Sequence, residues 1–224
     1  MKFQKYMAVG ILGLTMALGF SGCQSENQKN QDAYRKIGIN SMAEGDYDKA
    51  VKSFQKALDT SLGKIGAEEI DICYYKAAAQ FAKKDYDGAI ETYTSLIDYD
   101  KENANAYYLR GSVYLDTDKK DKAFKDYKNA VKYAGREYEI YEGIYENLTN
   151  KGETEEAKNY LKKALDIKPK DGADYAEQGH VYYLLEDYTQ AKSSLDRAID
   201  KDDKTALLYL AEVYNATDSF NLLL

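Results

Sequence analysis

The sequence predicts an all-α solenoid of helical hairpins, and three observations lead to this prediction. Alanines expected to be buried recur with spacings of 39, 34, 34 and 34 residues, at Ala50, Ala89, Ala123, Ala157 and Ala191. Apolar residues follow each alanine at i+4, i+7 and i+8, the spacing of one face of an α-helix. The only proline in the 224 residues is Pro169, so long helices are permitted nearly throughout. A fixed period of this length indicates a repeat architecture.

The chain begins with the layout of a signal peptide. Lys2 and Lys5 precede an uncharged apolar run at 7–20. As a helix this run would be about 21 Å long, shorter than the roughly 30 Å hydrocarbon core of a bilayer. We therefore expect a cleaved leader and not a membrane-spanning anchor.

The apolar run ends at Phe20-Ser21-Gly22-Cys23, which resembles a bacterial lipobox. In a lipobox small residues precede a cysteine that receives lipid before cleavage, although Leu is usual where Phe20 stands. The resemblance implies a lipoprotein signal peptide at 1–22 and lipidation of Cys23. The alternative is an ordinary signal peptide that leaves Cys23 as a free thiol.

A polar stretch follows, from Gln24 to Gln31, without an apolar residue to bury. We interpret residues 23–31 as the lipidated cysteine and its tether. The folded domain is expected to occupy 32–224.

A second helical pattern precedes each anchor alanine. In most copies an aromatic residue is followed four later by a small one, as in Tyr34 with Gly38, Tyr107 with Gly111, and Tyr175 with Gly179. A small residue lets the two helices of a hairpin approach closely. The turns between the helices carry an acid or hydroxyl that can cap the next helix: Gly45-Asp46-Tyr47, Lys84-Asp85-Tyr86, Gly152-Glu153-Thr154 and Glu186-Asp187-Tyr188.

These residues make the chain similar to the tetratricopeptide repeat (TPR) family, whose period is 34 residues. The resemblance implies a right-handed α-solenoid of about five TPR hairpins plus a C-terminal capping helix at Ala206–Tyr214. The repeats are expected at 31–64, 70–103, 104–137, 138–171 and 172–205, with a partial repeat at 204–224. Repeat four departs from the pattern at Tyr145, where a small residue is usual, and residues 62–69 are expected to lengthen a loop.

Composition restricts the partners and the chemistry. Without Lys2 and Lys5 the formal charge changes from −7 to −9, which argues against nucleic acid and anionic lipid surfaces as partners. Once Cys23 carries lipid, only Cys73 remains, so no intramolecular disulfide can form, and Cys73 is interpreted as a small buried hydrophobe.

No catalytic or metal-binding motif is recognised. His180 is the only histidine, so histidine-rich metal sites and catalytic triads lack their parts. The many carboxylate pairs are interpreted as solvated faces, and Asp116, Asp118 and Asp121 form a turn neutralised by interleaved lysines. We therefore expect no catalytic residue, no cofactor and no metal.

In TPR proteins the first helices of successive repeats line a concave groove that receives a peptide or a partner's helix. The groove positions implied by this resemblance include Tyr74, Phe81, Tyr108, Leu115, Glu142, Glu146, His180 and Tyr183. The tyrosines are equally consistent with packing between repeats. The Lys, Asn and Arg clamp with which some family members hold a terminal carboxylate is missing, so a segment with apolar and basic side chains fits better.

The sequence thus favours a lipid-anchored adaptor or scaffold on the extracytoplasmic side of a bacterial membrane. It would bind a protein or peptide in the groove, possible settings being envelope assembly or secretion, and would catalyse nothing. The alternative is an exported enzyme or small-ligand-binding protein with an unrecognised acidic pocket. An open groove would favour the first reading, and a deep pocket that gathers carboxylates would favour the second.

Overall fold

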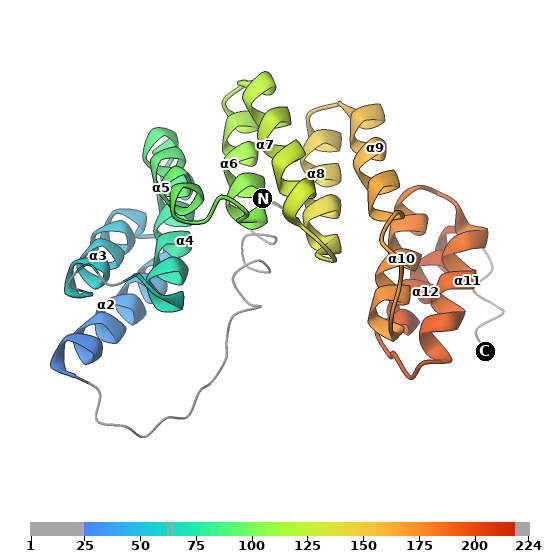
Figure 1. Cartoon of the computed structure of the whole chain (residues 1–224), viewed down its shortest axis with the longest axis horizontal. Helices are drawn as coiled ribbons and strands as arrows, with labels where there is room; N and C mark the ends of the chain where they lie inside the picture. The colour runs from blue at the N-terminus through green and yellow to red at the C-terminus, as the bar shows by residue number, and fades with distance from the viewer. Residues whose placement is uncertain (1–24, 62, 64, 218–224) are drawn as a thin grey trace. The chain divides into compact units, whose positions relative to one another are not determined.

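The computed structural model describes residues 25–61, 63 and 65–217. These residues form helical hairpins (Figure 1) that fall into two compact units, which divide between Tyr133 and Ala134, and each unit is described by itself. The expected signal peptide and Cys23 lie outside the described residues. Within the described residues, no helix combines the length and hydropathy that crossing a bilayer requires.

The first unit consists of three hairpins whose consecutive helices pack on one another. The pairs are α2 (Glu26–Ala43) with α3 (Tyr47–Thr60), α4 (Ala67–Ala82) with α5 (Tyr86–Tyr99), and α6 (Ala104–Asp116) with α7 (Lys120–Tyr133).

The second unit consists of two hairpins and a closing helix. The hairpins are α8 (Tyr138–Asn150) with α9 (Thr154–Ala164), and α10 (Gly172–Leu184) with α11 (Tyr188–Ile199). The last helix, α12 (Ala206–Ala216), packs against both α10 and α11. The predicted C-terminal capping helix is therefore confirmed.

The repeat columns read from the sequence are the buried columns of the structure. The five anchor alanines have no exposed surface, and the residues four positions after them, Phe54, Tyr93, Tyr127, Leu161 and Leu195, are at most 1% exposed. The residues seven positions after the anchors are buried as well. This agreement confirms the predicted register.

Three hairpins have glycine where their two helices touch. A Cβ built on Gly38 would lie 2.5 Å from Phe54, one on Gly111 2.8 Å from Tyr127, and one on Gly179 2.6 Å from Leu195. These distances are shorter than van der Waals contact, so a larger residue would push the helices apart. In repeat four Tyr145 is half-buried, and its hydroxyl donates to the Leu184 carbonyl at 3.5 Å.

The hairpin turns share a backbone feature that the sequence pattern did not predict. One residue in every turn has a left-handed backbone: Gly45, Lys84, Asp118, Gly152 and Glu186. In three of these turns the next residue, Asp46, Asp85 or Asp187, caps the following helix by accepting the predicted backbone hydrogen bond. Glu153 was expected to cap α9 in the same way, but its side chain makes no capping hydrogen bond to the described backbone.

Two helices begin earlier than the sequence suggested. The expected tether is helical from Glu26 onward, because Ser25 caps α2 by accepting from the amide of Gln28. Gln31 is buried and donates to Glu69 at 2.7 Å. Helix α4 begins at Ala67, so residues 67–69 of the expected 62–69 loop belong to its first turn.

Candidate functional site

The groove residues expected in the first unit are held mainly by packing. Tyr108 and Leu115 are only 7% and 2% exposed. Tyr108 therefore packs between helices and does not line an open groove. Leu115 likewise offers no exposed groove surface. The Tyr108 ring lies 6.4 Å from that of Tyr127, which occupies the space beside Gly111. Tyr108 is therefore part of the hairpin core.

Tyr74 and Phe81 are half-buried. The Tyr74 hydroxyl donates to Asn103 at 2.6 Å, and the Phe81 ring meets Tyr86 edge-on at 5.6 Å. Each therefore has an internal contact while keeping part of its surface accessible.

A small hollow lies on the first unit beside the loop that precedes α4. It has a volume of about 240 Å³, and Ile65, Cys73 and Tyr99 are among its lining residues. Cys73 is half-buried, not fully buried as expected, and burial raises the pKa of its thiol. The raised pKa disfavours the reactive thiolate, so the interpretation of Cys73 as a hydrophobe is supported.

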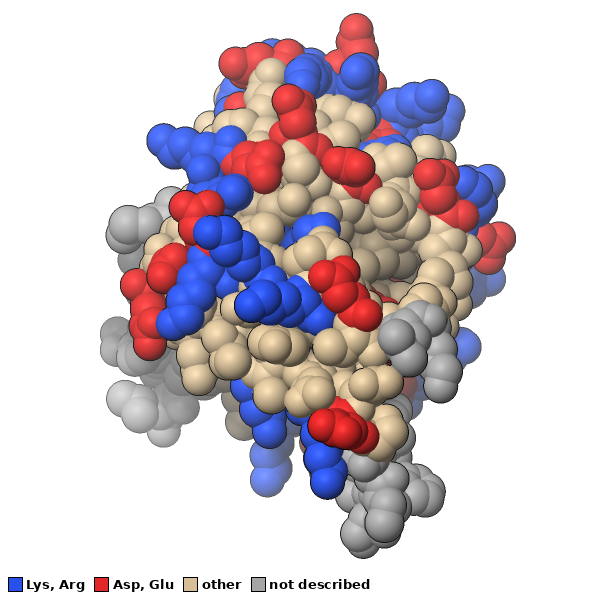
Figure 2. Space-filling view, turned by 90° about the vertical axis from the view of Figure 1, so that its left-hand side faces the viewer, with Lys and Arg blue, Asp and Glu red and all other residues tan. Residues whose placement is uncertain are grey.

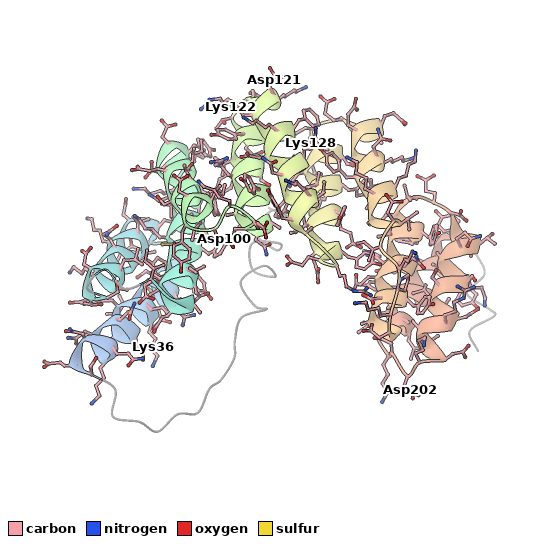
Figure 3. The ribbon with its side chains drawn as sticks, in the orientation of Figure 1. Lys36, Asp100, Asp121, Lys122, Lys128 and Asp202 are labelled. Atoms are coloured by element: carbon pink, nitrogen blue, oxygen red, sulfur yellow. The ribbon has the colours of Figure 1, made fainter. Side chains whose placement is uncertain are left out.

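The surface of the first unit carries charges of both signs. Figure 2 shows Lys and Arg intermixed with Asp and Glu on the face that carries α2 and α3. Asp121 and Lys122 lie side by side at the beginning of α7 (Figure 3), where both are exposed. This arrangement fits the solvated, locally neutralised turn that the sequence suggested.

In the second unit the structure brings expected groove residues together. Nδ1 of His180 on α10 lies 2.9 Å from Oε1 of Glu142 on α8, and the two side chains are only 18% and 11% exposed. The ring of Tyr183 stacks on His180 at 6.1 Å. Glu146, one turn after Glu142, is half-buried, with one carboxylate oxygen fully buried.

Two further residues complete this site and were missed in the sequence. Glu177 on α10 places a carboxylate oxygen within 4.8 Å of ligand-capable atoms of both Glu142 and His180. We call Glu142, Glu177 and His180 the acidic cluster. Tyr209 on α12 stacks on His180 at 4.3 Å, and its hydroxyl donates to Glu177 at 3.4 Å.

Glu177 was overlooked because it does not occupy one of the four groove positions of its repeat. The signal that could have found it is its spacing from His180. Residues three apart on a helix lie on the same face, so Glu177 and His180 must point to the same side of α10.

The carboxyl group of Glu177 has a raised pKa. Burial is the largest cause, and the negative charges of Glu142 and Glu139 add to it, raising the pKa from 4.5 to about 7. His180 and the hydrogen bond from Tyr209 oppose this shift without cancelling it. Glu177 therefore holds a proton during part of the time near neutral pH.

The imidazole of His180 also has a raised pKa. Burial acts to lower it, but the hydrogen bond to Glu142 and the charges of Glu142, Glu177 and Glu212 outweigh burial. His180 is thus the positive charge that partly balances the surrounding carboxylates. The acidic cluster is suited to attracting a cation or a basic side chain.

Family models match the chain along most of its length. The model described as "TPR repeat" matches residues 77–118, and two models described as "Tetratricopeptide repeat" match 32–61, 104–136 and 146–171, and 177–220. The chain belongs to the tetratricopeptide repeat family. These matches and the structure confirm the predicted all-α TPR solenoid class.

Known proteins similar to this TPR chain include two long relatives. Anaphase-promoting complex subunit 3 of Schizosaccharomyces pombe is 21% identical over 217 residues, covering 84% of this chain and 33% of the relative. Human tetratricopeptide repeat protein 13 is 27% identical over 154 residues, covering 63% of this chain and 17% of the relative. The TPR chain thus spans no more than about a third of either relative.

A solved structure of MamA protein has a similar fold. It is 20% identical, covers 86% of this chain and 96% of its own, and superposes with a TM-score of 0.50. At this identity the likeness concerns the fold alone. The TPR scaffold is one that supports protein–protein interaction.

Proposed function

We propose that this TPR protein is an adaptor, held by lipid on Cys23 at the extracytoplasmic face of a bacterial membrane, that binds a partner protein through the acidic side of its second unit. The partner segment would carry basic and apolar side chains. The protein would serve in envelope assembly or secretion. The adaptor needs no catalytic step.

The observation that carries the proposal is the combination of charge and aromatic surface around the acidic cluster. Glu142 and Glu177 are close together, and the half-buried rings of Tyr183 and Tyr209 lie beside them. Aromatic rings next to an unbalanced negative charge offer both an apolar contact and electrostatic steering to a basic segment. Tyr183 is therefore a better candidate anchor than the buried Tyr108.

The membrane-tethered part of the proposal depends on the sequence alone. Its support is the apolar leader that ends in Phe20-Ser21-Gly22-Cys23. Cys23→Ala is expected to leave an uncleaved or released protein. Mass spectrometry that finds mature wild-type protein with an unlipidated N-terminus would contradict lipidation.

The binding surface can be tested by crosslinking and pull-down from native membranes, followed by affinity measurements with the recovered partner. Tyr183→Ala and the double variant Glu142→Gln, Glu146→Gln are expected to weaken binding, and the loss in the double variant should shrink at high salt. Lys36→Gln, an exposed site on α2, is the matched control. A partner that binds all these variants with wild-type affinity would show that the surface is elsewhere.

A second candidate is an exported protein that binds a small ligand or catalyses a reaction in the acidic cluster. The observation that favours it is the raised pKa of Glu177, which holds a proton for part of the time near neutral pH beside the carboxylate of Glu142. A carboxyl group with a pKa raised by burial can act as a general acid. Saturable binding of a small cationic metabolite, abolished by Glu177→Gln, would support this candidate over the adaptor.

A further inference from the structure

The acidic cluster has the dimensions of a metal-ion site. Glu177 and His180 project from one face of α10, Glu142 faces them from α8, and one ligand-capable atom of each lies within 4.8 Å of the other two. Glu142 Oε1 and His180 Nδ1 are 2.9 Å apart. Two ligands on one Zn²⁺ ion, at bond lengths of about 2.0 to 2.2 Å, are roughly 3 to 3.5 Å apart. Small side-chain rotations are therefore enough to surround one ion.

The charge of the cluster is not balanced by lysine or arginine. In the part of the chain that the structure describes, the ion pair of Glu142 is with His180, and the charged groups that act on Glu177 are Glu142, Glu139 and His180. Carboxylates gathered in this way, with little exposure to water, repel one another. A bound cation would supply the missing positive charge.

A buried hydroxyl near the cluster gives a second, independent indication of a ligand. Tyr138, one turn before Glu142 on α8, is 1% exposed, and its hydroxyl has no hydrogen-bond partner within the described residues. Burial is the main reason that its pKa is raised to about 12. Arg136 opposes this rise and the charge of Glu177 adds to it, so this hydroxyl lies within electrostatic range of both Arg136 and the cluster. Buried hydroxyls normally have a partner, and a water carried by a metal ion at the cluster would provide one.

We propose that Glu142, Glu177 and His180 bind one divalent transition-metal cation, with Zn²⁺ as the reference ion. The imidazole nitrogen selects transition metals over Mg²⁺ and Ca²⁺, which prefer oxygen ligands alone. Tyr209, which donates to Glu177 and stacks on His180, orients both ligands from outside the metal shell. With three protein ligands, at least one coordination position stays open to water. A metal ion here would occupy the same carboxylates that the proposed function offers to a basic segment, so the two would compete.

Metal binding at this site releases protons. Both His180 and Glu177 must be unprotonated to coordinate the ion. The pKa of Glu177 is raised by burial and by the charges of Glu142 and Glu139, against the hydrogen bond from Tyr209, and the pKa of His180 is raised by Glu142, Glu177 and Glu212 against burial. Zn²⁺ should therefore bind more tightly at pH 8 than at pH 6. Mg²⁺ affinity, in contrast, should be much weaker at either pH.

The wild-type full chain permits a direct test, because His180 is its only histidine. Isothermal titration with Zn²⁺ should show one saturable site per chain. In NMR spectra the single pair of imidazole resonances should shift in step with that site and lose its titration below pH 7. If wild-type protein lacks saturable Zn²⁺ binding, or if Zn²⁺ binds while the imidazole resonances stay unchanged, the proposal is wrong.

Matched variants locate the ligands. His180→Gln and Glu177→Gln should each weaken Zn²⁺ binding at least tenfold, since even residues outside the metal shell typically change affinity 10- to 100-fold. Glu212→Gln removes one carboxylate from the exposed face of α12 and should stay within about threefold of wild type. Circular dichroism and melting of each variant without metal establish that it is folded. If Glu212→Gln weakens Zn²⁺ binding equally, the variants act only through overall charge, and the assignment of the three ligands is wrong.

Discussion

The two units use the same repeat but fill three equivalent positions of their inner helices differently. In the second unit these positions hold Glu142, Glu177 and His180, whereas 68 residues earlier they hold Tyr74, Leu109 and Ser112. The first unit satisfies this set internally: the Tyr74 hydroxyl donates to Asn103, the Ser112 hydroxyl donates to the Tyr108 carbonyl, and Leu109 packs against the apolar core. The same repeat therefore supports either positions whose side chains find their partners inside the unit or a charged site that needs a counterion.

A second pair of equivalent positions shows the reverse contrast. In the first unit Arg110 on α6 donates to both carboxylate oxygens of Asp126 on α7, at 2.7 and 2.9 Å. In the second unit the same positions hold Gln178 and Ser194, joined by one neutral hydrogen bond of 3.2 Å. Of these two equivalent links, the charged one belongs to the first unit and the neutral one to the second.

The largest effect should follow from breaking that link. Asp126 is 3% exposed, so Arg110→Ala leaves a buried carboxylate without its partner and should lower the free energy of unfolding by about 3 to 5 kcal/mol. Gln178→Ala should cost only about 1 kcal/mol, because a neutral hydrogen bond is lost. Chemical denaturation of both variants measures the difference. Equal losses would mean that the two links are energetically alike despite their charges.

Overpacking should affect both units alike, because the anchor alanines occupy the same place in the repeat. Ala123→Leu in the first unit and Ala157→Leu in the second should each lower stability by about 1 to 3 kcal/mol, since neither alanine has any exposed surface. Thermal melting followed by circular dichroism checks both. An unchanged melt in either variant would show that the hairpin tolerates expansion there and that the two units are not equivalent scaffolds.

The pH dependence of stability should distinguish the acidic cluster from the first unit. The pKa of Glu177 is raised in the folded state from 4.5 to about 7, so its stabilising protonation is complete below pH 4.5 and is lost as the pH rises through 7. The raised pKa of His180 acts in the same direction above its ordinary value of 6.5. Wild-type protein should therefore lose stability between pH 5 and pH 8. With a chelator present, this loss should be smaller in Glu177→Gln by about 1 to 2 kcal/mol, after allowance for solvent screening.

The first unit has its own titrating carboxyl group. Burial and the neighbouring Asp32 raise the pKa of Glu68 to about 7 as well. Glu68→Gln should therefore also make the free energy of unfolding less dependent on pH. The double variant Glu68→Gln, Glu177→Gln should show both reductions. If Glu177→Gln leaves the pH profile of wild type unchanged, the cluster does not titrate in this range.

The smallest effect concerns the turns. Glu186 has a left-handed backbone with φ of 66°, a conformation that costs a residue with a side chain more than it costs glycine. Glu186→Gly should stabilise the second unit by about 0.5 kcal/mol, and Gly152→Ala, at φ of 82°, should destabilise it by about 1 kcal/mol. Denaturant titration measures both. The same sign for the two variants would contradict the shared turn geometry.

Much of the fold could be predicted because its signals are local and periodic. The anchor alanines, the apolar columns that follow them and the caps at Asp46, Asp85 and Asp187 are all confirmed. The earlier start of α2 was missed because Ser25 supplies a cap that overrides the polar composition of the stretch after it. Glu153 shows the converse, since an acid at the capping position is not sufficient to make the hydrogen bond.

The candidate site could be predicted only in part from the sequence. Glu142 and His180 were placed in the groove by their repeat positions, and the structure joins them, while Glu177 and Tyr209 were not anticipated. Tyr108 could not be assigned to groove or core from the sequence, because a tyrosine satisfies both settings. What decided between them was the neighbouring Tyr127, whose ring fills the space beside Gly111.

The sequence by itself determined the repeat period, the helices and the columns that pack, because spacing along a helix dictates which side chains share a face. It also contained the excess of acids and the single histidine. Only the tertiary structure decided that Glu142 meets His180 and Glu177, 38 and 35 residues away along the chain. That meeting depends on how α8, α10 and α12 rotate against one another as their apolar faces pack, and a rotation of a fraction of a turn would separate the three side chains.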